Sequence, residues 1–328
     1  MGKTSDLYKL YTILSRYSDE EHQLSMKEIL EIMEKNGCKC SEDTIQRYLK
    51  QLVEDFSIDI ISSKGRNARY FIGGRLFQNE ELQLLIQAIS TSNFLNKSKT
   101  NDLIQKLVST VSEYDAKSLR ETSSGISVAK TQNNRVLINV NKVRKAFEEE
   151  KQISFKYMKW DKDKKLTSKE SKLHTMNPWK LIWANDRYYL YGYDTKKFNN
   201  TYKERCYRVD KMTEIKVTEI NREGKELFEK FDSDSFVSKM FDMYISKVEL
   251  ITIEIPETLI GAFFDQFGLE NVEVKQIEDK LEVTFKASTS KLLYGWLIGM
   301  EDVKVVKPDW VKEEIKELIE SNNSKYAQ

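Results

Sequence analysis

The stretch SEDTIQRYLKQLVEDF, residues 41–56, decides the fold of the N-terminal part of the chain. Ser41 is a favoured helix-capping residue, and the acids Glu42 and Asp43 follow it where the positive end of a helix dipole would lie. The apolar side chains after them recur every three or four residues, which is the spacing of an amphipathic helix. We expect this helix to pack inward through Ile45, Leu49, Leu52 and Val53.

Two more helices are predicted before this one. The first covers residues 4–17, and its apolar stripe consists of Leu7, Leu10, Tyr11 and Leu14. The second is expected over residues 25–36, because Ser25 and Glu28 have the spacing of a capping box and Asn36-Gly37 is a stop signal.

A β-hairpin is predicted after the third helix. Residues 58–62 read as a strand, residues 63–68 as a glycine-containing turn, and residues 69–72 as the returning strand. Three short helices followed by a hairpin are typical of a winged helix-turn-helix, which we assign to residues 1–75.

In a helix-turn-helix the third helix lies in the major groove of DNA. Arg47 can bond guanine through two hydrogen bonds and Gln46 can read adenine, whereas Ser41 and Thr44 can bond phosphates. The wing, residues 60–75, contains four arginines or lysines (Arg75 among them) and no acid, which suits a phosphate backbone. A solvated helix face and an ordinary basic turn are the alternatives. The predicted DNA-binding residues are Ser41, Thr44, Gln46, Arg47, Lys50, Lys64, Arg66, Asn67 and Arg69.

Three further regions follow. Residues 78–120 read as two amphipathic helical segments before a polar linker at 121–135, so residues 76–130 form a helical connector. Residues 131–220 combine a helix at 139–150 with the strand-like runs ISFKYM, KLIWA, RYYLYGY and ERCYRV, which predict a small β-barrel. From residue 248 the expected order is strand, helix, strand, strand, helix, strand, a ferredoxin-like arrangement within residues 221–328. The predicted fold class is therefore multidomain α+β.

Charge is distributed unevenly, although the net charge is only +1. Residues 131–220 hold 21 Lys and Arg against 12 Asp and Glu, a net charge of +9, while residues 221–328 have a net charge of −8. The basic segment is also rich in aromatic residues, and basic groups with stacking rings are what single-stranded nucleic acid requires. Because side chains alternate along a strand, about half of the rings must instead fill the barrel. These rings are Phe155, Tyr157, Trp160, Trp179, Trp183, Tyr188, Tyr189, Tyr191, Tyr193, Tyr202 and Tyr207.

The middle of the chain resembles the WYL domain of bacterial transcription regulators. The resemblance lies in PWKL at 178–181, RYYL at 187–190 and RCYRVDKM at 205–212. Tyr188 stands where the family's triplet begins with Trp, and Lys211 stands where its basic strand ends in Arg. The runs YGWLIG at 294–299 and VKVVKP at 303–308 are similar to the extension that usually follows a WYL domain.

This resemblance implies an Sm-like β-barrel that senses an anionic effector, a nucleotide or a single-stranded nucleic acid. It also implies that the C-terminal extension supports dimerisation. Arg205 and Arg208 are an odd number of residues apart in one strand, so they should face opposite sides and one of them should be structural. The residues carried over as effector-binding candidates are Tyr157, His174, Arg187, Tyr189, Arg205 and Arg208.

Several classes of function lack support in the sequence. No P-loop, HExxH, GxSxG or paired zinc-ligand motif is present, and the two histidines lie far apart, so we do not expect an enzyme, a cofactor or a metal site. We interpret Cys38, Cys40 and Cys206 as reduced thiols of a cytoplasmic protein. No apolar run is long enough to cross a bilayer.

The sequence thus predicts a sequence-specific transcriptional regulator that binds a double-stranded DNA operator as a homodimer. Two alternatives remain open. One is a general nucleic-acid-binding adaptor without promoter specificity, and the other is a nucleic-acid-processing enzyme that uses carboxylates. The sequence does not distinguish a repressor from an activator.

Overall fold

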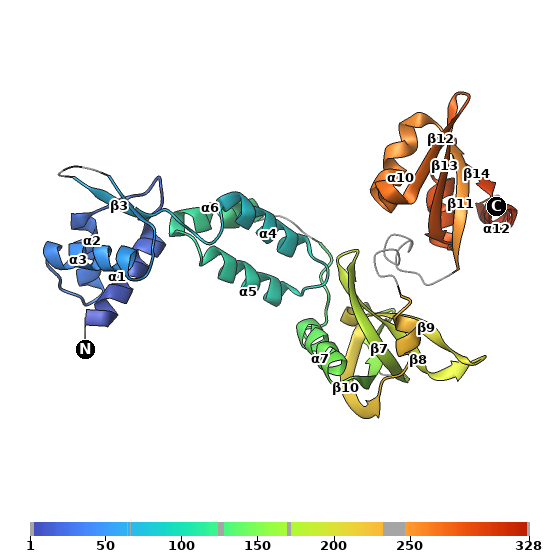
Figure 1. The fold of residues 1–328 in the computed structure, drawn as a ribbon, viewed down its shortest axis with the longest axis horizontal. Helices are drawn as coiled ribbons and strands as arrows, with labels where there is room; N and C mark the ends of the chain where they lie inside the picture. Colours follow the sequence, from blue (N-terminus) through green and yellow to red (C-terminus); the bar gives the residue numbers. More distant parts are fainter. Residues whose placement is uncertain are drawn as a thin grey trace. The chain divides into compact units, whose positions relative to one another are not determined.

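The computed structural model of the chain describes residues 3–63, 65, 67–123, 128–168, 172–231 and 247–326. The chain divides into two compact units, Met1–Asn134 and Arg135–Gln328. Both units contain helices and antiparallel sheets, which confirms the mixed α and β character predicted from the sequence (Figure 1). Within the described residues, no helix is both long and apolar enough to pass through a membrane.

Three helices and a small sheet form the first part of the N-terminal unit. The elements are α1 (Lys3–Tyr17), β1 (Leu24–Ser25), α2 (Met26–Lys35), α3 (Glu42–Glu54), β2 (Ile60–Ser62) and β3 (Arg69–Ile72). The strands pair antiparallel in the order β1-β3-β2. The helices and the β2–β3 hairpin lie where the sequence predicts them. Strand β1 was not predicted, because two residues are too few to show an alternating pattern.

Local capping determines where α2 and α3 begin. The Ser25 hydroxyl accepts a hydrogen bond from the Glu28 amide at 3.3 Å, and the Glu28 carboxylate accepts one from the Ser25 amide at 2.7 Å. The predicted capping box is therefore confirmed. Likewise, the Ser41 hydroxyl accepts a hydrogen bond from the Thr44 amide at 3.3 Å, so Ser41 is the N-cap of α3.

The inward stripe of α3 differs from the prediction at one position. Ile45, Leu49 and Leu52 are buried as expected, but Val53 is 45% exposed, so the prediction for Val53 was wrong. Tyr48, one turn after Ile45, is buried instead. Tyr48 extends the buried stripe on the side opposite Val53, so the buried face of α3 is centred between Ile45 and Leu52.

The rest of the N-terminal unit consists of three helices that lie side by side (Figure 1). They are α4 (Asn79–Thr91), α5 (Lys97–Val108) and α6 (Glu113–Ser123). The sequence predicted two helical segments here. The additional boundary arises from polar caps, since Asn96 accepts a hydrogen bond from the Lys99 amide at 2.8 Å and Ser112 accepts one from the Asp115 amide at 3.0 Å.

Arg75 connects these helices to α1 and is not part of a basic wing surface. Its guanidinium group donates hydrogen bonds to the carbonyl oxygens of Ser15, Ser18 and Thr110. Burial lowers the pKa of Arg75. The expectation that Arg75 contributes to phosphate binding is therefore wrong, because its donors are used within the fold.

The C-terminal unit begins with a helix and a five-stranded antiparallel sheet in the order β10-β4-β7-β8-β9. The elements are α7 (Val136–Glu148), β4 (Lys151–Tyr157), β7 (Leu173–Ala184), β8 (Arg187–Phe198), β9 (Thr201–Arg208), the 3-10 turn η1 (Val209–Lys211), β10 (Met212–Asn221) and α8 (Lys225–Phe228). A small hairpin of β5 (Lys159–Trp160) and β6 (Leu166–Thr167) follows β4. The buried Asn139 of α7 donates a hydrogen bond to the Met212 carbonyl at 2.7 Å and so fastens the helix to the strand.

The sheet has a hydrophobic cluster on each face. One contains Phe155, Leu190 and Tyr207, packed against α7; the other contains Tyr189, Tyr191 and Cys206, packed against Phe228 and Phe231. Gly192 allows β7 and β8 to approach closely, since a Cβ atom there would lie 2.0 Å from the Asn177 carbonyl oxygen.

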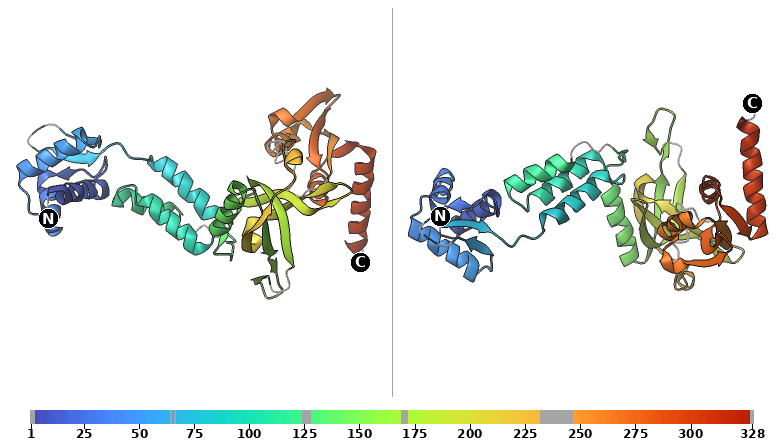
Figure 2. Two further views of the ribbon diagram at one scale, coloured as in Figure 1. Left: turned by 60° about the horizontal axis from the view of Figure 1, so that its bottom comes forward. Right: turned by 90° about the horizontal axis from the view of Figure 1, so that it is seen from above.

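A second α/β layer completes the unit. Its elements are β11 (Val248–Ile255), α10 (Ile260–Phe267), β12 (Val272–Ile277), β13 (Lys280–Ser288), α11 (Lys291–Ile298), β14 (Lys304–Lys307) and α12 (Asp309–Tyr326). The strand order is β12-β13-β11-β14, and the succession of elements over 248–307 is the predicted one. Figure 2 shows α12 as the long red helix at the end of the chain.

Candidate nucleic-acid interface and effector site

The predicted base-reading residues occupy the exposed face of α3. Gln46, Arg47 and Lys50 are exposed, whereas Ile45 and Tyr48 point into the core. The guanidinium carbon of Arg47 lies 5.5 Å from the centroid of the Tyr48 ring, so the buried ring supports the exposed cation. The Lys50 ammonium lies 3.7 Å from the Glu54 carboxylate in an exposed i,i+4 pair, which leaves it able to reorient toward a phosphate.

Ser41 and Thr44 form hydrogen bonds with each other at the start of α3. Their hydroxyl groups lie 3.0 Å apart, and Ser41 also accepts the Thr44 amide. A phosphate contact from Ser41 would have to share the oxygen that caps the helix. The structure thus gives these two residues a structural role beside the phosphate-binding role that the sequence suggested.

The wing residues fall into two groups. Lys64 and Arg66 lie outside the described residues. Asn67 is exposed, and Arg69 donates a hydrogen bond to the Gln23 carbonyl at 2.7 Å while it lies 3.9 Å from the Glu28 carboxylate. Arg69 therefore ties the base of the hairpin to the segment that leads into α2.

Two of the predicted effector residues belong to an aromatic group on one face of the five-stranded sheet. The His174 ring stacks on Phe155 at 5.4 Å between centroids, and its Nδ1 lies 3.4 Å from the Tyr207 hydroxyl. Tyr157 meets the same Tyr207 ring edge-on at 5.3 Å. Burial raises the pKa of Tyr157 to about 12. The pKa of His174 is lowered, mainly by burial and to a smaller extent by the charges of Lys172 and Arg205. Both side chains are thus held neutral.

Arg205 and Arg208 lie in different surroundings, as the alternation of side chains predicts. Arg205 forms two hydrogen bonds to the Asp194 carboxylate, at 2.8 and 2.6 Å, and these bonds raise its pKa. Arg208 forms two hydrogen bonds to Asp210, at 3.1 and 2.7 Å, and Asp210 is only 5% exposed.

Two arginines, Arg208 and Arg187, lie within electrostatic reach of Lys211. Burial lowers the pKa of Lys211, and the charges of Arg208 and Arg187 lower it further, so the three cations lie within electrostatic reach of one another. The Nε of Arg187 is buried and has no hydrogen-bond partner among the residues that the structure describes. Tyr189, buried, lies directly across from Arg208 in the register of β8 and β9. We call Arg187, Arg208 and Lys211 the cationic cluster.

The structure therefore does not bring the six predicted effector residues into one place. Tyr157, His174 and Arg205 lie together, whereas Arg187, Tyr189 and Arg208 form a second group; Tyr157 links the two through a hydrogen bond with the Arg208 backbone. Lys211 was not among the predicted residues. Its position at the end of a basic strand was the only sequence signal for it.

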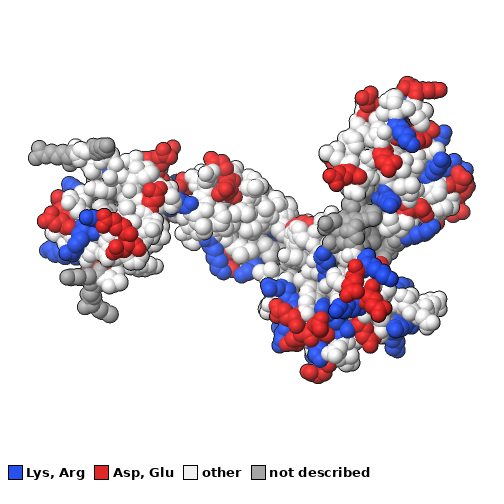
Figure 3. Space-filling model, viewed as in Figure 1, with Lys and Arg blue, Asp and Glu red and all other residues white. Residues whose placement is uncertain are grey.

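Most aromatic residues of this region are packed rather than displayed. Of the eleven rings noted in the sequence, only Trp160 and Trp183 are exposed, at 52% and 50%. Lysine and arginine side chains are interspersed with acids over the five-stranded sheet on the face that Figure 3 shows. The excess of positive charge is thus partly neutralised by local ion pairs.

Comparison with known proteins gives two matches. The family model of the WYL domain matches residues 139–217, which include most of α7 and most of the five-stranded sheet. The chain is similar to the proteasome accessory factor B/C (PafBC) of Arthrobacter aurescens, with 15% sequence identity and a TM-score of 0.30. The match covers 99% of this chain and 49% of that one, so this chain spans about half the length of PafBC. No curated protein matches the chain.

Proposed function

We propose that this chain, which carries a WYL domain at residues 139–217, is a dimeric transcriptional regulator that binds a specific double-stranded DNA sequence. In this proposal, residues 1–75 are a winged helix-turn-helix, the five-stranded sheet is an Sm-like barrel, and the C-terminal layer is a ferredoxin-like dimerisation module. In this proposal the protein acts by binding rather than by catalysis.

One observation carries the DNA-binding part of the proposal. Helix α3 is anchored by four buried residues and a serine cap, and it presents Gln46, Arg47 and Lys50 outward. Arginine and glutamine are the residue types that read guanine and adenine in the major groove. A capped helix that exposes these residues beside a β-hairpin favours the recognition of bases over nonspecific electrostatic binding to the DNA backbone.

Charge balance favours two copies on the DNA. Residues 1–130 hold 18 Lys and Arg and 18 Asp and Glu, so one copy gains little from the phosphate charge. Two copies on a two-part operator double the number of base contacts.

The cationic cluster is the place where we propose that the effector binds. Arg208 is paired with Asp210, and Lys211 lies within electrostatic reach of Arg208, Arg187 and this carboxylate. The buried Nε of Arg187 has no hydrogen-bond partner among the described residues. Such a group favours a phosphate-bearing ligand, a nucleotide or the end of a nucleic-acid strand. Arg205, which is paired with Asp194 across two strands, is assigned a structural role.

The test is selection of sheared genomic DNA on the purified chain at physiological salt. Recovery of a few fragments by the wild-type chain, lost in Arg47→Ala and kept in Lys27→Ala, is the expected result. Lys27 is a matched control, because it is an exposed cation on the neighbouring helix α2. If the wild-type chain, Arg47→Ala and Lys27→Ala all recovered genomic fragments without preference, the protein would instead be a general nucleic-acid binder.

A further inference from the structure

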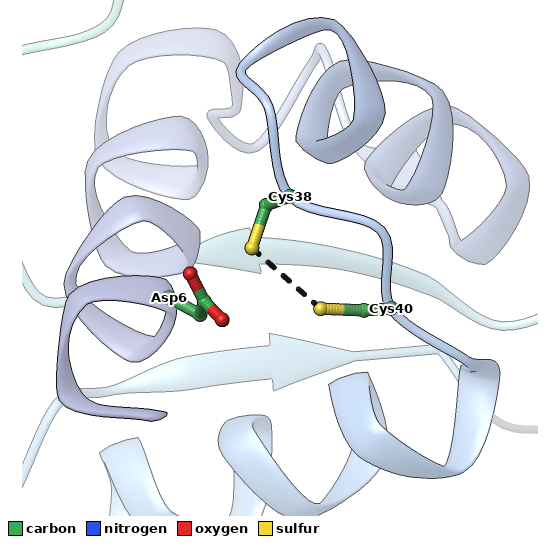
Figure 4. Close-up of side chains that lie close together, drawn as sticks. All are labelled: Asp6, Cys38 and Cys40. Atoms are coloured by element: carbon green, nitrogen blue, oxygen red, sulfur yellow. Dashed lines mark hydrogen bonds between the residues drawn. The ribbon is translucent and has the colours of Figure 1, made fainter. Parts of the chain in front are cut away.

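Two cysteines and an aspartate meet at the start of the DNA-reading helix. Cys38 and Cys40 lie in the connection between α2 and α3, and Asp6 projects toward them from the first turns of α1 (Figure 4). The two sulfur atoms are 3.8 Å apart, and all three potential ligand atoms lie within 4.8 Å of one another. Cys38 is only 4% exposed, while Asp6 and Cys40 are half-buried.

The separation of the two sulfur atoms fits a tetrahedral metal centre. A zinc ion binds thiolate sulfur at about 2.3 Å, so two thiolates at tetrahedral corners lie roughly 3.8 Å apart. The observed separation of the Cys38 and Cys40 sulfur atoms is 3.8 Å. A disulfide, by contrast, requires about 2.05 Å between the sulfurs, so the pair would have to move considerably closer to oxidise.

The chemistry of the three ligands selects the kind of ion. Thiolates prefer borderline or soft metals, which disfavours magnesium and calcium, and a carboxylate oxygen completes a set that zinc accepts. We propose that Asp6, Cys38 and Cys40 bind one zinc-class divalent ion, with the fourth position open to water or to an exogenous ligand. Binding displaces one proton from each thiol, so each ion taken up releases protons to the solvent.

The location gives this site a consequence for the helix that follows. Cys40 immediately precedes Ser41, the N-cap of α3, and Asp6 lies in α1, so a bound ion joins α1 to the beginning of α3. Metal binding therefore stabilises the N-terminal unit. An effect of the metal on DNA affinity rests on the proposed function, whereas metal binding itself does not.

Cobalt titration of the reduced, metal-free full chain tests the site. We expect a near-ultraviolet thiolate-to-cobalt absorption band that saturates at one ion per chain and disappears when zinc is added. Cys40→Ser should weaken cobalt binding and cut the band at saturation to roughly half or less, because one of the two thiolate ligands is lost. Asp6→Asn should weaken cobalt binding at least about tenfold, since losing even an outer-shell partner typically costs that much.

Cys206→Ser is the matched control, because Cys206 is the remaining cysteine and lies in the five-stranded sheet. It should leave the cobalt band unchanged. No thiolate band in the wild-type chain with all thiols reduced would overturn the proposal, as would a band of undiminished intensity and affinity in Cys40→Ser. Far-ultraviolet circular dichroism verifies that the variants fold. If Cys40→Ser does not fold, the cobalt affinity of Asp6→Asn tests the site, and an affinity equal to that of the wild-type chain would overturn the proposal.

Discussion

The Asp19 carboxylate accepts a hydrogen bond from the Ser112 hydroxyl at 2.6 Å and thereby joins the end of α1 to the start of α6. The other oxygen of the same carboxylate accepts the His22 amide at 2.7 Å. The His22 ring in turn stacks on Tyr114, with 3.7 Å between centroids. Asp19 and Ser112 are both buried, so this junction between α1 and α6 is made of satisfied polar groups.

Asp19→Asn should destabilise the N-terminal unit. The amide cannot accept all the bonds that the carboxylate accepts, and an unsatisfied buried group should lower the free energy of unfolding by about 1–3 kcal/mol. Urea denaturation, followed by circular dichroism, measures this change. Glu20→Gln removes an exposed charge from the neighbouring residue and should change stability little. Equal effects of the two substitutions would contradict the role assigned to Asp19.

The same carboxylate gives the junction a pH dependence. Burial raises the pKa of Asp19, but the hydrogen bonds from Ser112 and His22 outweigh it, so the pKa lies below its ordinary value. Its contribution is complete above the ordinary pKa of an aspartate and is lost as the pH falls through the lowered value. The difference in unfolding free energy between the wild-type chain and Asp19→Asn should therefore shrink as the solution is made strongly acidic. A constant difference would refute this assignment.

His174 should stay neutral to a lower pH than an ordinary histidine. Its pKa is lowered by burial and by Lys172 and Arg205, so stability is complete above the ordinary histidine pKa and falls as the pH drops through the lowered value. The chain contains two histidines, so nuclear magnetic resonance can follow each imidazole, with His174→Gln to assign the signal. Titration of His174 at or above the ordinary histidine pKa would show that the aromatic group does not shield it.

Arg47→Ala should weaken binding to a selected operator by about 1–3 kcal/mol, the usual contribution of a base-reading arginine. The loss should be smaller on nonspecific DNA, because Arg47 is expected to read a base rather than a phosphate. Fluorescence anisotropy at fixed salt measures both affinities, with Lys27→Ala as the control. An equal loss on both DNAs would assign Arg47 to the phosphate backbone.

Asp210→Asn should destabilise the chain, because the like charges of the cationic cluster then repel one another without a neutralising carboxylate. Loss of the buried carboxylate leaves Arg208 unpaired beside Lys211 and Arg187, and we expect a destabilisation of about 2–3 kcal/mol. Pyrophosphate should restore part of the melting temperature when compared with chloride at equal ionic strength.

Asp194→Asn breaks the corresponding bond to Arg205 and is the control for this experiment. It should destabilise the chain, and pyrophosphate should restore less of the melting temperature than in Asp210→Asn, because this pair is not the proposed effector site. If both variants respond to pyrophosphate alike, the effect is general and the cationic cluster is not an anion site.

Several features of the fold follow from the sequence because their causes are local. The Ser25–Glu28 capping box, the Ser41 cap and the stripe through Ile45, Leu49 and Leu52 each depend on residues less than three helical turns apart. The residues that make these interactions are neighbours in the sequence, so their spacing alone predicts where the helices begin and which face is apolar. The succession of helices and strands over residues 248–307 is likewise visible in periodicity alone.

The partners of individual charged side chains were decided only by the tertiary structure. Nothing near Arg75 in the sequence shows that it donates hydrogen bonds to the carbonyl oxygens of Ser15, Ser18 and Thr110. The sequence also does not show that Arg205 pairs with Asp194 whereas Arg208 pairs with Asp210. Asp6 is separated from Cys38 by more than thirty residues, so only the packing of α1 against the connection before α3 brings them together. Local spacing determines which helices and strands form, whereas long-range packing determines which polar groups are left to bind DNA, an anion or a metal.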